Sequence, residues 1–123
     1  MCLVDEGEGW DFYRDEWRRC AKPFLCYECS RDVERGERYF YAAGVLAGES
    51  RWEVYKLCEQ CRAIACQWLM GQCGGWLYGG VWEDLDGHRG EIVGDLDLGR
   101  ALVGMRRKWR KRDGSLMAVP RAA

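Results

Sequence analysis

CYECSRDVERGERYFYAAGVLAGESRWEVYKLCEQC, residues 26–61, decides the fold of this chain because it begins and ends with a pair of cysteines. Cys26 and Cys29 form the first pair, Cys58 and Cys61 form the second, and 28 residues lie between the two pairs. Two C-x-x-C motifs are typical of a tetrahedral metal site with four thiolate ligands. Thiolates are soft ligands that select zinc. We therefore predict that these four residues bind one structural zinc ion.

The residues between the two pairs predict a β-hairpin followed by a helix. GERYFYAAG at 36–44 and RWEVYKL at 51–57 are rich in aromatic and β-branched residues, and glycines separate them. Apolar residues then recur at helical spacing from Cys58 to about Gln72. Cys58 and Cys61 fall in the first turn of this helix, where free amide groups and the helix dipole favour thiolate over thiol.

A zinc ion held by four thiolates carries excess negative charge. Arg31, Lys56 and Arg62 lie near the cysteines in the sequence and are expected to offset that charge. The four ligands leave no position for water or substrate, so the site is expected to stabilise the fold and not to catalyse a reaction.

The segment before the first cysteine pair is expected to form an amphipathic helix. Trp10, Tyr13, Trp17 and Ala21 recur at helical spacing, and Pro23 would end the helix. Further along the chain, the glycine-rich stretch at 73–91 contains three residues that could share one face of a short helix: Val81, Leu85 and His88.

The C-terminal part of the chain predicts a basic amphipathic helix. Its apolar stripe repeats at intervals of four, three and four residues and consists of Leu98, Leu102, Met105 and Trp109. Asp95 or Asp97 could cap this helix, and Asp113 with Gly114 would end it.

These elements predict a small α+β fold in a single domain, residues 1–123. A zinc-binding core occupies 22–73, an acidic helix occupies 1–21, and a glycine-rich connector with the basic helix occupies 74–123. A domain with 16 glycines and 32% charged residues has a modest core for its length, so a metal would add needed stability.

Cysteine usage and the absence of targeting segments predict a cytoplasmic protein. The chain starts with an acidic stretch instead of a secretory signal, and no apolar run is long enough to span a bilayer, so no membrane association is expected. In a reducing compartment, paired C-x-x-C motifs indicate metal ligands. The alternative, a secreted disulfide framework, would need an export signal.

Charge is segregated along the chain although the net charge is only −1. Residues 83–97 are acidic, whereas six positive charges fall within the seven residues 106–112. These seven are the candidate contacts for nucleic acid or another partner: Arg106, Arg107, Lys108, Trp109, Arg110, Lys111 and Arg112. Such a cluster could follow a phosphate backbone. Neutralisation by the acidic stretch within the same molecule is an equally good explanation.

The order of knuckle, hairpin and helix resembles the treble-clef zinc fingers. The cysteine frame, the GERY at 36–39 and the K-x-C-x-x-C at 56–61 are also similar to a pattern in small uncharacterised phage and prophage proteins. The second resemblance implies an accessory role or the blocking of a host defence. One departure from the treble-clef pattern is that Ser30, and not glycine, follows the second cysteine of the knuckle.

Some treble clefs are nucleases of the His-Asn-His type, and this chain lacks the residues for that reaction. It has a single histidine, His88, and no asparagine. We therefore expect a non-enzymatic binding module without a small-molecule substrate. Its function would be either nucleic-acid binding through the basic helix or protein binding as an inhibitor of a host defence complex, as in an anti-CRISPR or other anti-defence protein.

The remaining cysteines leave one question open. Cys20 is most simply a small core residue. A second zinc site built from Cys20, Cys66, Cys73 and His88 is conceivable, but nothing in their spacing imposes it.

Overall fold

A computed structural model of the chain describes residues 10–46, 48, 51–66, 79–87, 90, 92–93 and 96–120. In the described part the fold is α+β, as predicted. The strands are β1 (Trp10–Arg19), β2 (Phe24–Leu25), β3 (Asp32–Val33), β4 (Arg38–Leu46), β5 (Glu53–Cys58), β6 (Ile92–Val93) and β7 (Leu96–Asp97). The helices are α1 (Glu59–Ile64), α2 (Val81–Asp86) and α3 (Leu98–Arg106).

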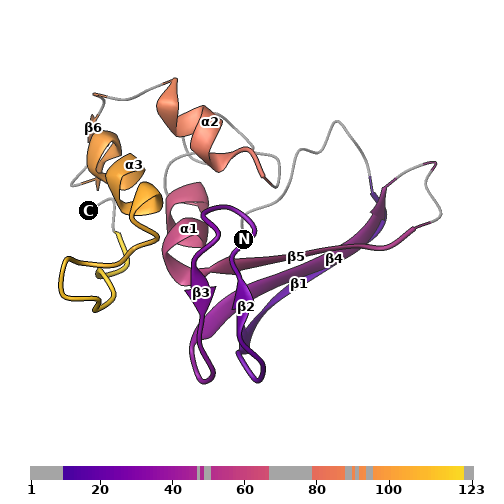
Figure 1. The fold of residues 1–123 in the computed structure, drawn as a ribbon. Helices are drawn as coiled ribbons and strands as arrows, with labels where there is room; N and C mark the ends of the chain where they lie inside the picture. Colours follow the sequence, from indigo (N-terminus) through magenta and orange to yellow (C-terminus); the bar gives the residue numbers. More distant parts are fainter. Residues whose placement is uncertain are drawn as a thin grey trace.

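The main sheet is antiparallel, with the strand order β1-β4-β5. The predicted hairpin is present as β4 and β5, and its register pairs Phe40 with Leu57 and Ala42 with Tyr55. Figure 1 shows that this sheet extends away from the rest of the molecule, with α1 and the short β2–β3 hairpin at one end. The cysteine pairs therefore lie at the end of the sheet that carries the other elements.

The predicted N-terminal helix is wrong for the described residues, because residues 10–19 form strand β1. β1 runs antiparallel to β4, with Trp17 opposite Phe40 and Arg19 opposite Arg38. Aromatic side chains favour strands, and backbone pairing along most of β4 outweighs a weak helical periodicity. In the predicted helix Trp17 would lie on the buried apolar face. In strand β1 its side chain is 39% exposed.

The helix after the hairpin starts where it was predicted. Cys58 is the N-cap of α1, and the first helical residue is Glu59. Residues 67–72, the rest of the predicted helix, lie outside the described part. The predicted short helix is present as α2, which buries Val81 and Leu85; His88 lies outside the described residues.

The C-terminal helix is shorter than predicted. α3 begins with the predicted cap, since the Asp97 carboxylate accepts hydrogen bonds from the backbone N–H groups of Gly99 (2.9 Å) and Arg100 (3.3 Å). It ends at Arg106, seven residues before the predicted end near Asp113.

The early end of α3 comes from two consecutive residues in the left-handed region, Lys108 at φ 54° and Trp109 at φ 56°. They reverse the chain, so only Arg106 of the basic cluster is helical. Burial of the Trp109 ring in the core offsets the backbone strain, which amounts to about 1–2 kcal/mol per residue.

The core joins the near end of the sheet to the three helices. It contains Phe40, Ala42, Leu57, Ile64, Val81, Leu85, Leu98, Ala101, Leu102, Met105 and Trp109 together with buried cysteines. Among the described residues, no helix is both long enough and apolar enough to cross a membrane.

Candidate metal centre

The first cysteine pair lies on the turn that joins β2 to β3. The backbone N–H of Cys26 donates to the carbonyl of Arg31 (2.8 Å), and that of Ser30 donates to the carbonyl of Cys26 (2.9 Å). These bonds close a tight turn that directs both sulfurs toward those of Cys58 and Cys61. Ser30 has a φ of 62°, the left-handed conformation for which glycine is usual. Ser30, which stands where the treble-clef pattern has glycine, therefore adopts a strained backbone conformation.

The second pair is held by the start of α1. The backbone N–H of Cys61 donates to the Cys58 sulfur at 3.5 Å, so Cys58 caps the helix with its own side chain. Two further backbone N–H groups, those of Cys58 (3.3 Å) and Glu28 (3.4 Å), donate to the Cys26 sulfur. Backbone donors aimed at sulfur stabilise the thiolate form, which is the form that binds metal.

All four sulfurs lie within 4.8 Å of one another. The Cys29 and Cys58 sulfurs are 3.8 Å apart, and a tetrahedron with metal–sulfur distances of ~2.3 Å has edges of about that length. All four are free cysteines, so no covalent bond between sulfurs explains their proximity. The predicted clustering is confirmed, and the donor set fits a metal ion such as zinc.

Charge within the cluster is distributed unevenly. Hydrogen bonds from Cys29, Cys58 and Cys61 lower the pKa of Cys26, whereas burial raises the pKa of Cys58 and Cys61. Hydrogen-bond donors therefore favour the thiolate form of Cys26, and burial disfavours it for Cys58 and Cys61. A divalent cation would supply the charge that allows the other sulfurs to ionise.

Arg31, one of the three cations that the sequence placed near the cysteines, interacts with the Cys58 sulfur. Its side chain is 1% exposed and donates from Nη2 to Glu37 (2.9 Å) and to Gln60 (3.1 Å). Burial lowers the pKa of Arg31, but the Glu37 carboxylate and the Cys58 sulfur outweigh this effect and raise it. Gln60 in turn donates to the carbonyl of Met117 (3.0 Å), so the network connects the knuckle with the C-terminal segment.

Glu37 is the carboxylate that accepts hydrogen bonds from Arg31 in this network. Its pKa is lowered overall: burial acts to raise it, but the Arg31 hydrogen bond, the Glu34 backbone N–H and the charges of Arg31 and Arg110 outweigh burial. Arg110 of the basic cluster is therefore close enough to act on the Glu37 carboxylate.

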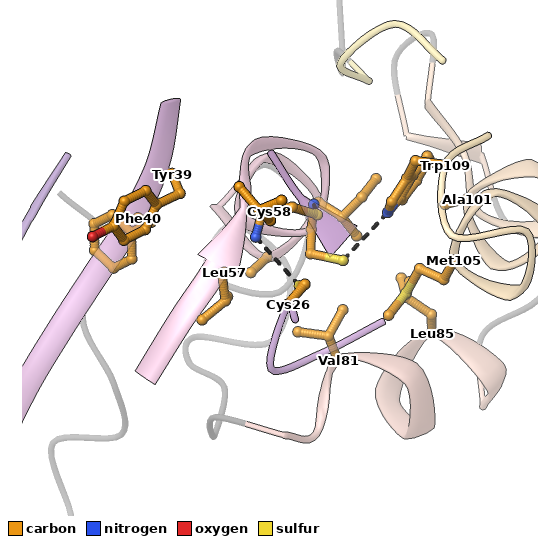
Figure 2. Close-up of a cluster of buried hydrophobic side chains, with 14 of the residues drawn as sticks. Cys26, Tyr39, Phe40, Leu57, Cys58, Val81, Leu85, Ala101, Met105 and Trp109 are labelled. Atoms are coloured by element: carbon orange, nitrogen blue, oxygen red, sulfur yellow. Dashed lines mark hydrogen bonds between the residues drawn. The ribbon is translucent and has the colours of Figure 1, made fainter. Parts of the chain in front are cut away.

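Trp109 connects the basic cluster to the metal centre. It is 3% exposed, and its indole Nε1 donates to the Cys61 sulfur at 3.3 Å. Figure 2 shows the nitrogen of the ring pointing toward the cysteines, with Met105 and Leu85 below the ring in this view. The sequence marked Trp109 as part of a helical stripe, but nothing in the sequence indicated a contact with a cysteine 48 positions away.

Glu28 is a second residue that the sequence did not single out. Its carboxylate accepts hydrogen bonds from the backbone N–H groups of Gly79 (2.6 Å) and Val81 (3.2 Å) at the start of α2. The N-cap of α2 is Gly80, which has no side chain for this role. Glu28, which lies between Cys26 and Cys29, caps the helix instead. Burial raises the pKa of Glu28 to about 7.

The candidate binding residues flank Trp109 on a turn. Arg106, Arg107, Lys108, Lys111 and Arg112 are exposed, and Arg110 is half-buried. Arg110 pairs with Leu116 in an isolated bridge, and the backbone N–H of Met117 donates to the Trp109 carbonyl at 2.7 Å. The cations thus flank one buried side chain, Trp109, along the chain.

The other cysteines do not form a second cluster within the described residues. Cys20 is a buried free thiol that donates to the Lys22 carbonyl at 3.1 Å, as expected for a core residue. Cys66 is disulfide-bonded and offers no thiolate here. Cys73 and His88, the other proposed members of a second site, lie outside the described residues.

Comparisons with known proteins add no relative to these observations. No family model matches the chain, and no curated protein or solved structure matches it significantly.

Proposed function

We propose that the protein is a zinc-stabilised, non-enzymatic module that binds nucleic acid through residues 106–112, the basic segment. Trp109 carries this proposal, because its contact with Cys61 ties the basic segment to the four-cysteine centre. The metal would then stabilise the fold and also hold six cations around one buried ring. Cations in a fixed arrangement can contact several phosphates at once.

Zinc is the metal that this site fits best, because four thiolates in a buried tetrahedron suit a soft ion with no geometric preference of its own. Its four positions would be filled by Cys26, Cys29, Cys58 and Cys61. A site filled in this way has no place for a substrate, which supports a binding function over an enzymatic one. The order of β2–β3 turn, β4–β5 hairpin and α1 supports the treble-clef resemblance.

The similarity of the cysteine frame to small phage proteins supports an accessory role in the cytoplasm of a host cell. Nucleic acid is the partner that the exposed cations favour, because phosphate contacts need arginine and lysine side chains that water can reach.

Fluorescence anisotropy with a labelled oligonucleotide tests this function. We expect the triple variant Arg107→Gln, Lys111→Gln and Arg112→Gln to weaken binding by at least about tenfold and to reduce the slope of log K against log salt by about 2. These residues are exposed, so the variant should fold normally.

A matched control removes three charges elsewhere: Arg14→Gln, Arg51→Gln and Arg100→Gln, all at exposed positions. If the two triple variants lost the same affinity for the oligonucleotide, net charge alone would drive binding. That result would contradict a specific role for the basic segment. Zinc-loaded protein that binds no oligonucleotide even at low salt would refute the function itself.

An exposed apolar row favours a second candidate, a protein-binding module that inhibits a host defence complex. Phe12 and Trp52 are 52% and 53% exposed and meet edge to face, with ring centroids 5.1 Å apart. Val54, also exposed, lies on the neighbouring part of β5. Exposed apolar patches often mark protein contacts. Capture of a host protein that survives nuclease treatment and is lost in Phe12→Ser/Trp52→Ser would support this candidate.

A further inference from the structure

Two arginines face each other where β1 ends and β4 begins. The register places Arg19 directly opposite Arg38, so the two side chains project from the same face of the sheet. Like charges in directly opposed positions destabilise a sheet. This arrangement is therefore unfavourable for stability alone, and an anion between the two side chains would make it favourable.

Trp17, Arg18, Arg19 and Arg38 line an open hollow at this end of the sheet. The Arg38 guanidinium lies 3.8 Å from the centroid of the Trp17 ring. The Arg18 guanidinium lies 3.6 Å from the centroid of the Tyr41 ring. Cation–π contacts of this kind hold a guanidinium in place while leaving its N–H groups accessible.

Cations outnumber carboxylates around the hollow. Two ion pairs are present, Arg18 with Glu16 (2.6 Å) and Arg38 with Glu59 (3.5 Å). Arg19 donates instead to a neutral group, the carbonyl of Gly36 (3.1 Å). Trp17, Arg19 and Arg38 share one face of the sheet, whereas the Arg18 guanidinium lies on the opposite face against Tyr41, so Arg19 and Arg38 supply the positive charge of the hollow.

The hollow lies at the same end of the molecule as the basic segment. Cys20, which follows Arg19, donates its backbone N–H to the carbonyl of Glu37 (2.8 Å), and the Glu37 side chain is within reach of the charge on Arg110. A nucleic acid that contacts both sites must be long enough to reach from the basic segment to the hollow.

We propose that the hollow formed by Trp17, Arg18, Arg19 and Arg38 binds a phosphate group of a nucleic-acid backbone, as a second contact beyond the basic segment. This inference rests on the proposed function and deepens it. The guanidinium group matches phosphate because it presents parallel N–H donors in a planar fork. A phosphate in the hollow would accept hydrogen bonds from Arg38, which lies over the Trp17 ring, and from Arg19 at the opposed position of the neighbouring strand.

The experiment measures anisotropy of a labelled oligonucleotide with the zinc-loaded full chain over a salt series. The test variant is Arg19→Gln/Arg38→Gln. The control is Arg14→Gln/Arg51→Gln, which removes the same charge from two exposed residues that do not line the hollow. We expect the test variant to bind about tenfold more weakly with a salt slope smaller by about 1, and the control to change binding by less than about twofold.

Arg38→Gln also removes the ion pair of Arg38 with Glu59 and the contact with the Trp17 ring, so the thermal midpoint of each variant is measured alongside, and affinities are compared only at a temperature where both variants are fully folded. Affinity and salt slope equal to those of the control would overturn the inference. If that equality were found while the basic-segment triple variant still lost binding, the proposed function would stand. Absence of binding by the unmodified protein would refute both.

Arginine Nε resonances give an independent readout of the ligand. The signals of Arg19 and Arg38 should shift when the oligonucleotide is added. Shifts that saturate with inorganic pyrophosphate alone, with no response to the oligonucleotide, would assign the hollow to a free anion and overturn the inference.

Discussion

Replacing Gly104 by alanine tests how Trp109 is held against the metal centre. Gly104 lies inside α3, and a methyl group added there would fall 2.6 Å from Cε3 and 2.9 Å from Cη2 of the Trp109 ring, and nearer still to Cζ3. Carbon atoms do not approach so closely, so the ring must move. Because the ring is buried and its indole N–H donates a hydrogen bond to the Cys61 sulfur, this movement should break that hydrogen bond.

The expected loss of stability follows from two opposing effects. Alanine is the better helix former by about 1 kcal/mol in a helix interior. Overpacking a tight core costs about 1–3 kcal/mol, and complete expulsion of a tryptophan approaches the cost of its deletion, about 3–5 kcal/mol. After the helix-forming gain is subtracted, we expect Gly104→Ala to lower the free energy of unfolding by about 2–4 kcal/mol if the ring is expelled from the core, and by about 0–2 kcal/mol if the ring only shifts within it.

Gly99→Ala is the matched control, because it makes the same change in the same helix. Its added methyl group would meet only the Asp97 carboxylate, at 3.3 Å. Chemical denaturation of the zinc-loaded proteins, followed by circular dichroism, should show a loss for Gly104→Ala and little change or a gain for Gly99→Ala. If the two variants were equally stable, the ring would not be held as described and the anchoring argument would fail.

Three further predictions concern the metal centre and its surroundings. Cys61→Ser should abolish the single bound zinc ion seen by native mass spectrometry, whereas Cys20→Ser, outside the cluster, should retain it; zinc bound equally by both would contradict the ligand set. Ser30→Gly should raise the thermal midpoint, because glycine relieves left-handed strain of about 1 kcal/mol, and a lower midpoint would argue against that conformation. Glu28→Ala should cost about 1–2 kcal/mol of unfolding free energy through the lost cap of α2, and unchanged stability in denaturant would count against that contact.

The four-cysteine cluster could be predicted from the sequence because its geometry is encoded locally. Each C-x-x-C pair fits a single turn, and only the hairpin between the pairs had to be found. Aromatic and β-branched residues on both sides of glycines were sufficient for that. The start of α1 followed because Cys58 is also its cap.

β1 could not be separated from a helix by its pattern. Tyr13 and Trp17 are four positions apart, and this spacing places residues on one face in a helix and also in a strand. Pairing with β4 decided between the two, and no local property of the sequence reports that pairing. The same limit applies to the end of α3, since Lys108 and Trp109 are not residues that usually mark a left-handed turn.

The contacts that the sequence did not reveal share one property: each joins the cysteine region to a distant segment. Glu28 reaches the start of α2, and Trp109 reaches Cys61. Helices α2 and α3 pack against each other; Glu28 joins the turn of the first cysteine pair to the start of α2, and Trp109, which follows the end of α3, contacts Cys61 of α1. A zinc ion that held the four cysteines would, through the contact between Trp109 and Cys61, also help to position the cations that flank Trp109. In a disordered tail, the positions of the cations would not depend on the metal. Dependence of oligonucleotide binding on the metal would therefore distinguish a positioned phosphate-binding surface from a solvated run of like charges.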